Sequence, residues 1–168
     1  MEGADPGGDR LSEKHLTVCF IILSYEVSIM FQVTPVRSRE LQAELAAAVG
    51  CPFIENTFAF CAVELSDDAT EVRGLIALCQ FTYSPEEAVI RSVGIMPESE
   101  GDEAVTVLIR GVMAFLNRAE IPFVYADETA ASPEQLKAWS FRRGEDGRLG
   151  IDLKKFYKAP CHYDDDAK

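Results

Sequence analysis

The chain has 168 residues, of which 48% are hydrophobic and 26% are charged, so it is long and apolar enough to form one ordinary globular domain. Its 16 Lys and Arg residues against 28 Asp and Glu residues give a net charge of −12 and a pI near 4.6. An acidic surface of this kind repels nucleic acid and anionic membranes, and neither is expected as a partner.

Residues 1–29 differ in character from the rest of the chain. Residues 1–14 are polar and acidic, and the apolar run Leu16–Leu23 is too short for a membrane span and lacks the basic flank of a secretory signal. Two interpretations stay open. Glu26-Val27 can be encoded by a ribosome-binding sequence just before Met30, which would make residues 1–29 an extension outside the natural protein; alternatively, Leu16–Phe31 forms an additional strand.

A truncation that begins at Met30 distinguishes these interpretations. If Met30 is the natural start, the truncated chain should unfold cooperatively and melt within a few degrees of the full chain. Circular dichroism measures the unfolding of both chains. If the truncated chain no longer unfolds cooperatively, the additional strand is established instead.

From Met30 onward the predicted elements follow in a clear order. Alternating hydrophobicity predicts a strand over Phe31–Val36, and Ser38 is expected to cap a helix over Arg39–Val49 that Gly50 ends. Three strands separated by short turn segments come next, at Phe58–Leu65, Val72–Tyr83 and Ala88–Ile95. Connections this short permit only antiparallel hairpins, which argues against a Rossmann fold.

The second half of the chain begins with a predicted amphipathic helix over Glu100–Arg118. A strand over Phe123–Ala126 follows. The next helix is expected to start at Ser132, where Pro133 occupies its first position and Gln135 completes a capping box. The final elements are predicted to be strand-like at Arg148–Leu153 and Phe156–Tyr157, with residues 164–168 as a solvated acidic tail.

The resulting order, β-α-β-β-β-α-β-α-β in an α/β (α+β) mixed sheet with an antiparallel meander, resembles the GNAT N-acetyltransferase superfamily. The resemblance covers roughly Phe31–Tyr163, and we assign residues 30–163 to one domain. Val93-Gly94-Ile95-Met96-Pro97 is similar to the family's V-x-P strand end, and Ser140-Phe141-Arg142-Arg143 lies where members usually have Gly-Phe.

This resemblance implies a cofactor site. In the family, the fourth and fifth strands splay apart, the fourth strand's backbone holds the pantetheine arm of acyl-CoA, and the loop before the long helix binds the pyrophosphate. Carried over to this chain, it implies that the cofactor-binding residues are Val93, Gly94, Ile95, Gly101, Asp102, Ala104 and Val105.

The residues of the cofactor loop depart from the family pattern. Its basic or amide position is Glu100 here, and two of its glycine positions are Glu103 and Val105. Each carboxylate about 6 Å from a phosphate charge would cost roughly 3 kcal/mol at an effective dielectric constant of about 20. The same acids also have an explanation without a ligand, because Ser99 and Asp102 can form a capping-box-like pair and acids in a first helical turn complement the helix dipole.

The catalytic residues are unknown from sequence. Family members often carry a carboxylate on the fourth strand and a Tyr on the last helix, whereas this chain has Arg91, Ser92 and Leu136 there. The retained candidates are Glu64 as a base and Tyr125 as an acid. Further candidates of the same kinds are Glu55, Asp127 and Tyr157. Four aromatic residues either line a substrate cleft or pack in the core: Phe58, Phe60, Trp139 and Phe141.

Two functions stay open on this evidence. The first is a divergent GNAT-like acyltransferase with a degenerate site, which would transfer an acetyl or acyl group from acetyl-CoA or another acyl-CoA to an amine. The second is a non-catalytic GNAT-fold binding or assembly module that has lost CoA binding. The acidic surface suits a small-molecule amine or a basic protein, and a homodimer stays open.

The cysteine and histidine residues bear on the cellular compartment and on metal binding. The five cysteines are odd in number and mostly lie in apolar runs, which is typical of a reducing, cytoplasmic environment. Together with the two histidines they show no metal-ligand spacing, so no metal site is predicted. The cysteines are Cys19, Cys51, Cys61, Cys79 and Cys161.

Overall fold

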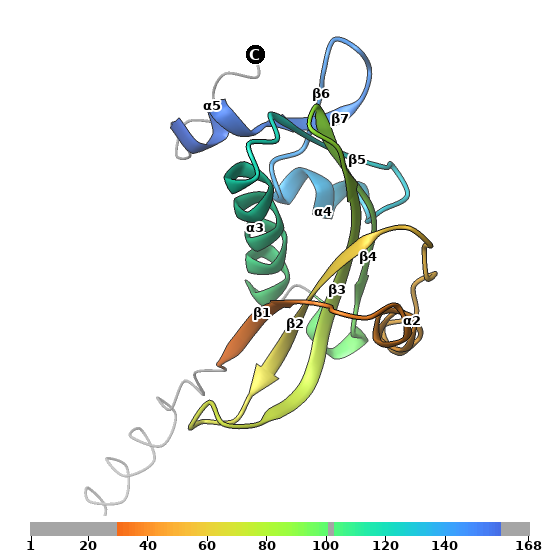
Figure 1. Ribbon diagram of the computed structural model, residues 1–168, viewed down its shortest axis with the longest axis vertical. Coiled ribbons are helices and arrows are strands. Elements are labelled where there is room, and N and C mark those ends of the chain that lie inside the picture. The colour runs from red at the N-terminus through yellow and green to blue at the C-terminus, as the bar shows by residue number, and fades with distance from the viewer. Residues whose placement is uncertain (1–29, 101–102, 159–168) are drawn as a thin grey trace, which may run out of the picture.

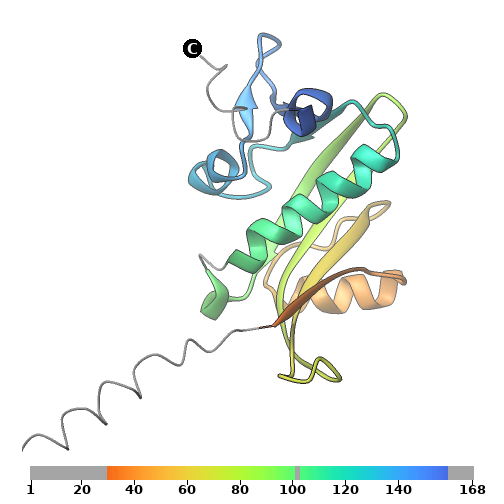
Figure 2. The same ribbon diagram turned by 90° about the vertical axis from the view of Figure 1, so that its left-hand side faces the viewer.

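The computed structural model describes residues 30–100 and 103–158, which form a seven-stranded sheet with helices on both faces. Helix α3 (Glu103–Arg118) covers one face of the sheet, and helix α2 (Arg39–Ala48) lies against the opposite face (Figures 1 and 2). In sheet order, the strands are β1 (Phe31–Pro35), β2 (Phe58–Leu65), β3 (Val72–Tyr83), β4 (Glu87–Ile95), β5 (Phe123–Ala126), β7 (Leu149–Asp152) and β6 (Arg142–Arg143).

Strands β1 to β4 form an antiparallel meander, and β5 then pairs with β4 in parallel. Strand β7 pairs antiparallel with both β5 and β6. This arrangement confirms the predicted mixed sheet and the prediction against a Rossmann fold. No helix within residues 30–100 and 103–158 is both long and apolar enough to cross a membrane.

The predicted caps of the helices after Ser38 and Ser132 are confirmed. The Oγ of Ser38 accepts a hydrogen bond from the amide of Leu41 at 3.1 Å, and Gly50 follows α2 with a φ of +69°. Helix α4 (Pro133–Ala138) starts with the predicted capping box, in which the side chains of Ser132 and Gln135 each accept from the other's backbone amide.

The start of the long helix differs from the prediction. Helix α3 begins at Glu103, and Pro97–Ser99 form a separate 3₁₀ turn, η2. Ser99 is buried in that turn, and its amide donates to the carbonyl of Met96 at 2.9 Å. Ser99 is therefore part of η2, and its predicted capping partner, Asp102, lies outside the described residues together with Gly101.

The prediction of a strand at Phe156–Tyr157 is wrong. These residues belong to helix α5 (Leu153–Lys158), which follows β7 directly. The Oδ1 of Asp152 accepts from the amide of Lys155 at 3.0 Å, as a helix-capping Asp does, and Phe156 is buried against the core. The capping signal in Asp152-Leu153-Lys154-Lys155 therefore outweighs the strand preference of the two aromatic residues.

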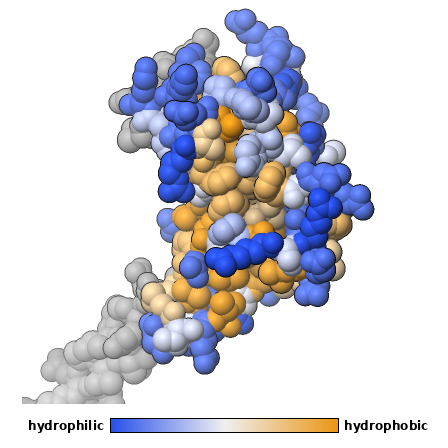
Figure 3. All heavy atoms as spheres, in the orientation of Figure 1, coloured by the Kyte–Doolittle hydropathy of each residue, from blue (hydrophilic) through white to orange (hydrophobic). Residues whose placement is uncertain are grey.

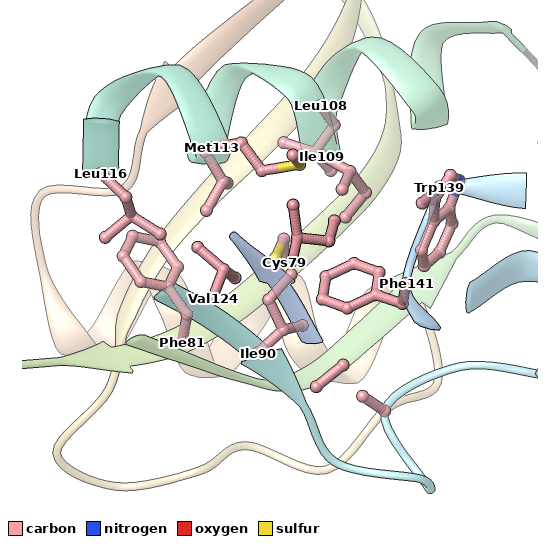
Figure 4. Packing of buried hydrophobic residues seen from close by; sticks show 14 of the residues in the cluster. Cys79, Phe81, Ile90, Leu108, Ile109, Met113, Leu116, Val124, Trp139 and Phe141 are labelled. Carbon is pink, nitrogen blue, oxygen red and sulfur yellow. The ribbon is translucent and has the colours of Figure 1, made fainter. Parts of the chain in front are cut away.

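The main hydrophobic core lies between α3 and the sheet. Trp139 and Phe141 are 3% and 2% exposed and belong to this core, and the ring of Phe141 points toward the middle of the cluster (Figure 4). Phe60 packs against the same cluster, whereas Phe58 is 54% exposed. Core packing therefore accounts for three of the four aromatic residues that were cleft candidates.

A buried hydrogen-bond network attaches the loop between α2 and β2 to the middle of β3. Gln80 is fully buried; its Nε2 donates to the carbonyl of Pro52 at 2.8 Å, and its Oε1 accepts from the amide of Ile54 at 3.0 Å. Gln42 of α2 also donates to this Oε1 at 2.9 Å, and to the hydroxyl of Thr57 at 2.7 Å. The network fixes both α2 and the loop over one face of the sheet.

Candidate functional site

Strands β4 and β5 separate in the middle of the sheet. They pair only from Glu87 with Phe123 to Ile90 with Ala126. Beyond this point β4 carries a bulge: Phe81 faces Ile90 while Gln80 faces Ser92, so Arg91 is the extra residue. Because a bulge bends its strand and increases the local twist, the second half of β4 diverges from β5. The splayed strands that the resemblance implies are present.

The chain itself enters this splay. We call residues 127–131, which follow β5, the strap. The amide of Val93 donates to the carbonyl of Ala130 at 2.8 Å, and the amide of Asp127 donates to the carbonyl of Ile90 at 2.9 Å. The Arg91 guanidinium adds an ion pair to Asp127 at 3.2 Å. Ala130 is only 3% exposed, so this residue of the strap is packed into the splay, whereas Glu128 and Thr129 are exposed.

The strap uses a backbone group that the resemblance assigns to the cofactor. The amide of Met96 donates to the carbonyl of Ile76, so by the alternation of an antiparallel ladder Ser92 and Gly94 bond toward β3. The amides of Val93 and Ile95 then point to the other edge, where pantetheine would lie. One of these two amides is already bonded to Ala130.

Gly94 faces α2 and is closely covered. A Cβ at this position would lie 2.2 Å from Cγ2 of Val49 and 2.8 Å from the Sγ of Cys51, so no larger residue fits without movement. The glycine thus permits the end of α2 to pack on β4. This packing is a structural reason for Gly94 that needs no ligand.

The N-terminal end of α3 presents acids to solvent and apolar side chains to the core. Ala104 and Val105 are 1% and 4% exposed and pack with the main cluster. Val105 is therefore a core residue, and a glycine in its place would open the core. Three exposed acids lie at or just before this end of the helix in the sequence: Glu98, Glu100 and Glu103. A phosphate bound to the free backbone amides at the start of α3 would be repelled by these carboxylates.

The two retained catalytic candidates lie at opposite ends of the sheet. Glu64 pairs with Gly74 near the start of β3. This part of β3 extends past the end of β4, whose last residue, Ile95, pairs with Ala77. Tyr125 pairs with Val89 near the start of β4. The sheet therefore does not bring this carboxylate and this phenol to one reaction centre.

Tyr125 is held in a stack. The guanidinium of Arg148 lies 3.4 Å from the centre of the Tyr125 ring and bonds both carboxylate oxygens of Glu87, at 2.7 and 2.9 Å. These hydrogen bonds hold the pKa of Glu87 below its usual value. A Cβ at Gly150 would lie 2.7 Å from Cδ1 of Tyr125, so a glycine beneath the ring is required for this packing.

The remaining candidates are also separated or occupied. Asp127 is paired with Arg91, Glu55 is exposed on the loop after α2, and Tyr157 lies on α5, where burial raises its pKa. Leu136, at the position of the family's Tyr, is 2% exposed in the core. Within residues 30–100 and 103–158, no group of His, Cys, Asp and Glu side chains has the arrangement of a metal site.

The strap was not predicted from sequence. Its one local signal is the pair Ala130-Ala131 between β5 and the capped helix α4, because small residues permit a close approach of two backbones. Arg91 carried a second signal, since a cation on the fourth strand requires a nearby acid when it is half-buried, and Asp127 is that acid.

No protein-family profile and no curated protein matches the sequence. Solved structures do match the fold. The ribosomal-protein-S18-alanine N-acetyltransferase from Escherichia coli aligns over 74% of this chain and 94% of its own, with a TM-score of 0.54 and 12% identity. The spermidine/spermine N-acetyltransferase SpeG from Vibrio cholerae aligns over 76% and 95%, with a TM-score of 0.51 and 13% identity.

A third match, the GNAT family N-acetyltransferase YhbS from Escherichia coli in complex with CoA, covers 77% of this chain and 84% of its own at 10% identity, with a TM-score of 0.52. The chain therefore has the fold of the GNAT N-acetyltransferase superfamily. At such low identities this similarity establishes the fold alone.

Proposed function

We propose that this chain is a GNAT-fold binding or assembly module that does not use acyl-CoA. The observation that carries the proposal is the 2.8 Å hydrogen bond from the amide of Val93 to the carbonyl of Ala130. Entry of a pantetheine arm would require this buried bond to break and the packed Ala130 to leave the splay. A buried amide or carbonyl that loses its partner costs about 1–3 kcal/mol, and this cost would reduce the binding free energy of the cofactor.

Charge supports the same proposal independently. The acids Glu98, Glu100 and Glu103 lie at or just before the helix end that would receive the pyrophosphate, and Val105 fills a position that a glycine would leave open. The residues of the cofactor site within 30–100 and 103–158 therefore argue against CoA at both of its attachment points. The net charge of −12 supports a basic protein or an amine as the partner.

A divergent acyltransferase is the second function that the fold allows. The three solved structures described above are acetyltransferases, and this favours an enzyme. An active enzyme would have to displace the strap and position an acceptor amine without a carboxylate over Ala88–Ile95 of β4 or a Tyr at position 136. The carboxylate at the start of β4, that of Glu87, is bonded to Arg148. Such an enzyme would then depend on positioning of the thioester alone.

Calorimetric titration of the full chain with acetyl-CoA tests the proposal. We expect no binding heat up to about 1 mM ligand, which corresponds to a binding free energy weaker than about −4 kcal/mol. Two results would refute the module and establish the acyltransferase: saturable binding with one site per chain, and acetyl transfer to an alkylamine, measured by the release of the CoA thiol.

A further inference from the structure

The basic residues of this acidic chain are concentrated in one segment that precedes its acidic tail. Residues 137–158 contain seven of the chain's 16 Lys and Arg residues and only three of its 28 Asp and Glu residues. In the structure this segment forms the end of α4, the β6–β7 hairpin and α5, at the upper end of Figure 1. Hydrophilic residues gather at this end, whereas apolar atoms gather over the middle of the molecule (Figure 3). Within residues 137–158 the bases therefore outnumber the acids, so this segment attracts an anion more than the rest of the chain does.

A pocket of about 370 Å³ lies between α4 and strands β6 and β7. Its inner wall is apolar: Leu136 and Phe141 are buried, Leu149 is half-buried, and Pro133 of α4 completes the wall. The volume is at the lower end of the range for small-molecule sites, which are mostly apolar with a few polar groups. A single ring or a short alkyl chain fits such a wall.

The rim of the same pocket carries three bases and one acid: Lys137, Arg142, Arg143 and Glu128. Arg142 is held at the rim because its Nη1 donates to the carbonyls of Lys137 and Phe141, both at 3.0 Å. Nη2 of Arg143 contacts Oε1 of Glu128 at 2.7 Å. The Arg143 guanidinium is thus already placed to bind a carboxylate at the mouth of the pocket.

The bond between Arg143 and Glu128 is easily exchanged. The two side chains are 57% and 67% exposed, and an ion pair this exposed contributes little to stability. A ligand carboxylate could therefore replace that of Glu128 without a large loss. An amine, by contrast, would meet three cations and only one acid.

We propose that this pocket binds a small amphipathic anion, an aryl or alkyl carboxylate. Its apolar part lies against Leu136, Phe141 and Leu149, and its carboxylate replaces that of Glu128 on Arg143. The inference goes beyond the proposed function, because Val93 does not line the pocket, although Glu128 of the strap does, and its test contains no CoA. Failure of one proposal therefore leaves the other to be judged by its own experiment.

Three ligands that share a phenyl ring and carry an anionic, a cationic or a neutral end group test the chemistry of the site. The full chain is titrated with phenylacetate, phenethylamine and 2-phenylethanol, and backbone amide shifts are followed by NMR. We expect phenylacetate to bind about fivefold or more tightly than the other two, and its largest shifts to lie at Leu136, Phe141 and Leu149. Equal or tighter binding of the amine, or shifts centred elsewhere, would overturn the proposal.

Variants then test the residues. Arg143→Gln should weaken phenylacetate binding about tenfold, and Glu128→Gln should strengthen it about twofold or more because the competing carboxylate is gone. Arg73→Gln is the matched control, since Arg73 forms an exposed ion pair with Asp67, 3.3 Å apart, on another part of the sheet. It should leave the affinity unchanged.

Leu149→Trp should fill the pocket and abolish binding. Thermal melts check that each variant is folded. If Leu149→Trp does not fold, the surface variant Arg143→Gln still decides the question. Unchanged affinity in Arg143→Gln would refute the anchoring role and with it the proposal.

Discussion

Replacement of Gln80 by Leu should lower the free energy of unfolding by about 3 kcal/mol, although the two side chains are similar in size. The substitution removes the partner of the Pro52 carbonyl, the Ile54 amide and one donor of Gln42. A buried polar group that loses its partner costs about 1–3 kcal/mol, and less where water can reach it, as at the exposed Pro52. Urea denaturation followed by circular dichroism measures the effect.

Gln32→Leu is the matched control for this substitution. Gln32 lies on the edge strand β1 with an exposed side chain, so the same chemical change should alter stability by less than about 0.5 kcal/mol. If Gln80→Leu unfolds at nearly the same urea concentration as wild type, the network does not hold α2 and its loop to β3. The account of how that face of the sheet is built would then be wrong.

The double variant Glu100→Arg/Glu103→Gln should separate the two barriers to CoA. It converts repulsion at the start of α3 into attraction, so affinity for adenosine 3′,5′-bisphosphate at low salt should rise about tenfold or more. Acetyl-CoA should bind this variant no more tightly than the bisphosphate does. The pantetheine arm adds no binding free energy as long as the amide of Val93 donates its hydrogen bond to the carbonyl of Ala130.

Calorimetric titration of wild type and variant with both ligands gives the ratio of the acetyl-CoA affinity to the bisphosphate affinity. Glu134→Arg serves as the control, because Glu134 is an exposed acid in the first turn of a different helix, α4. It should leave both affinities unchanged. A variant that binds acetyl-CoA much more tightly than the bisphosphate would mean that charge alone excluded the cofactor and that the strap gives way.

The chain's own residues determined most of the element order. Hairpin lengths, the 3.6-residue spacing of α3 and the caps at Ser38 and Ser132 are local signals, each set by residues within a few positions of one another. Local competition also explains the error at Phe156–Tyr157, where the capping Asp152 and burial of Phe156 outweighed the strand preference of the aromatic residues.

The candidate site depended instead on contacts between distant segments. The acids at the start of α3 were visible in the sequence, but burial of Val105 and the separation of Glu64 from Tyr125 follow from packing and register. The decisive bond joins the backbone of Val93 to that of Ala130, and a backbone amide and carbonyl are present at almost every residue whatever its side chain. Sequence alone therefore predicts a cofactor loop with unfavourable charge, whereas only the tertiary structure places the strap in the splay between β4 and β5.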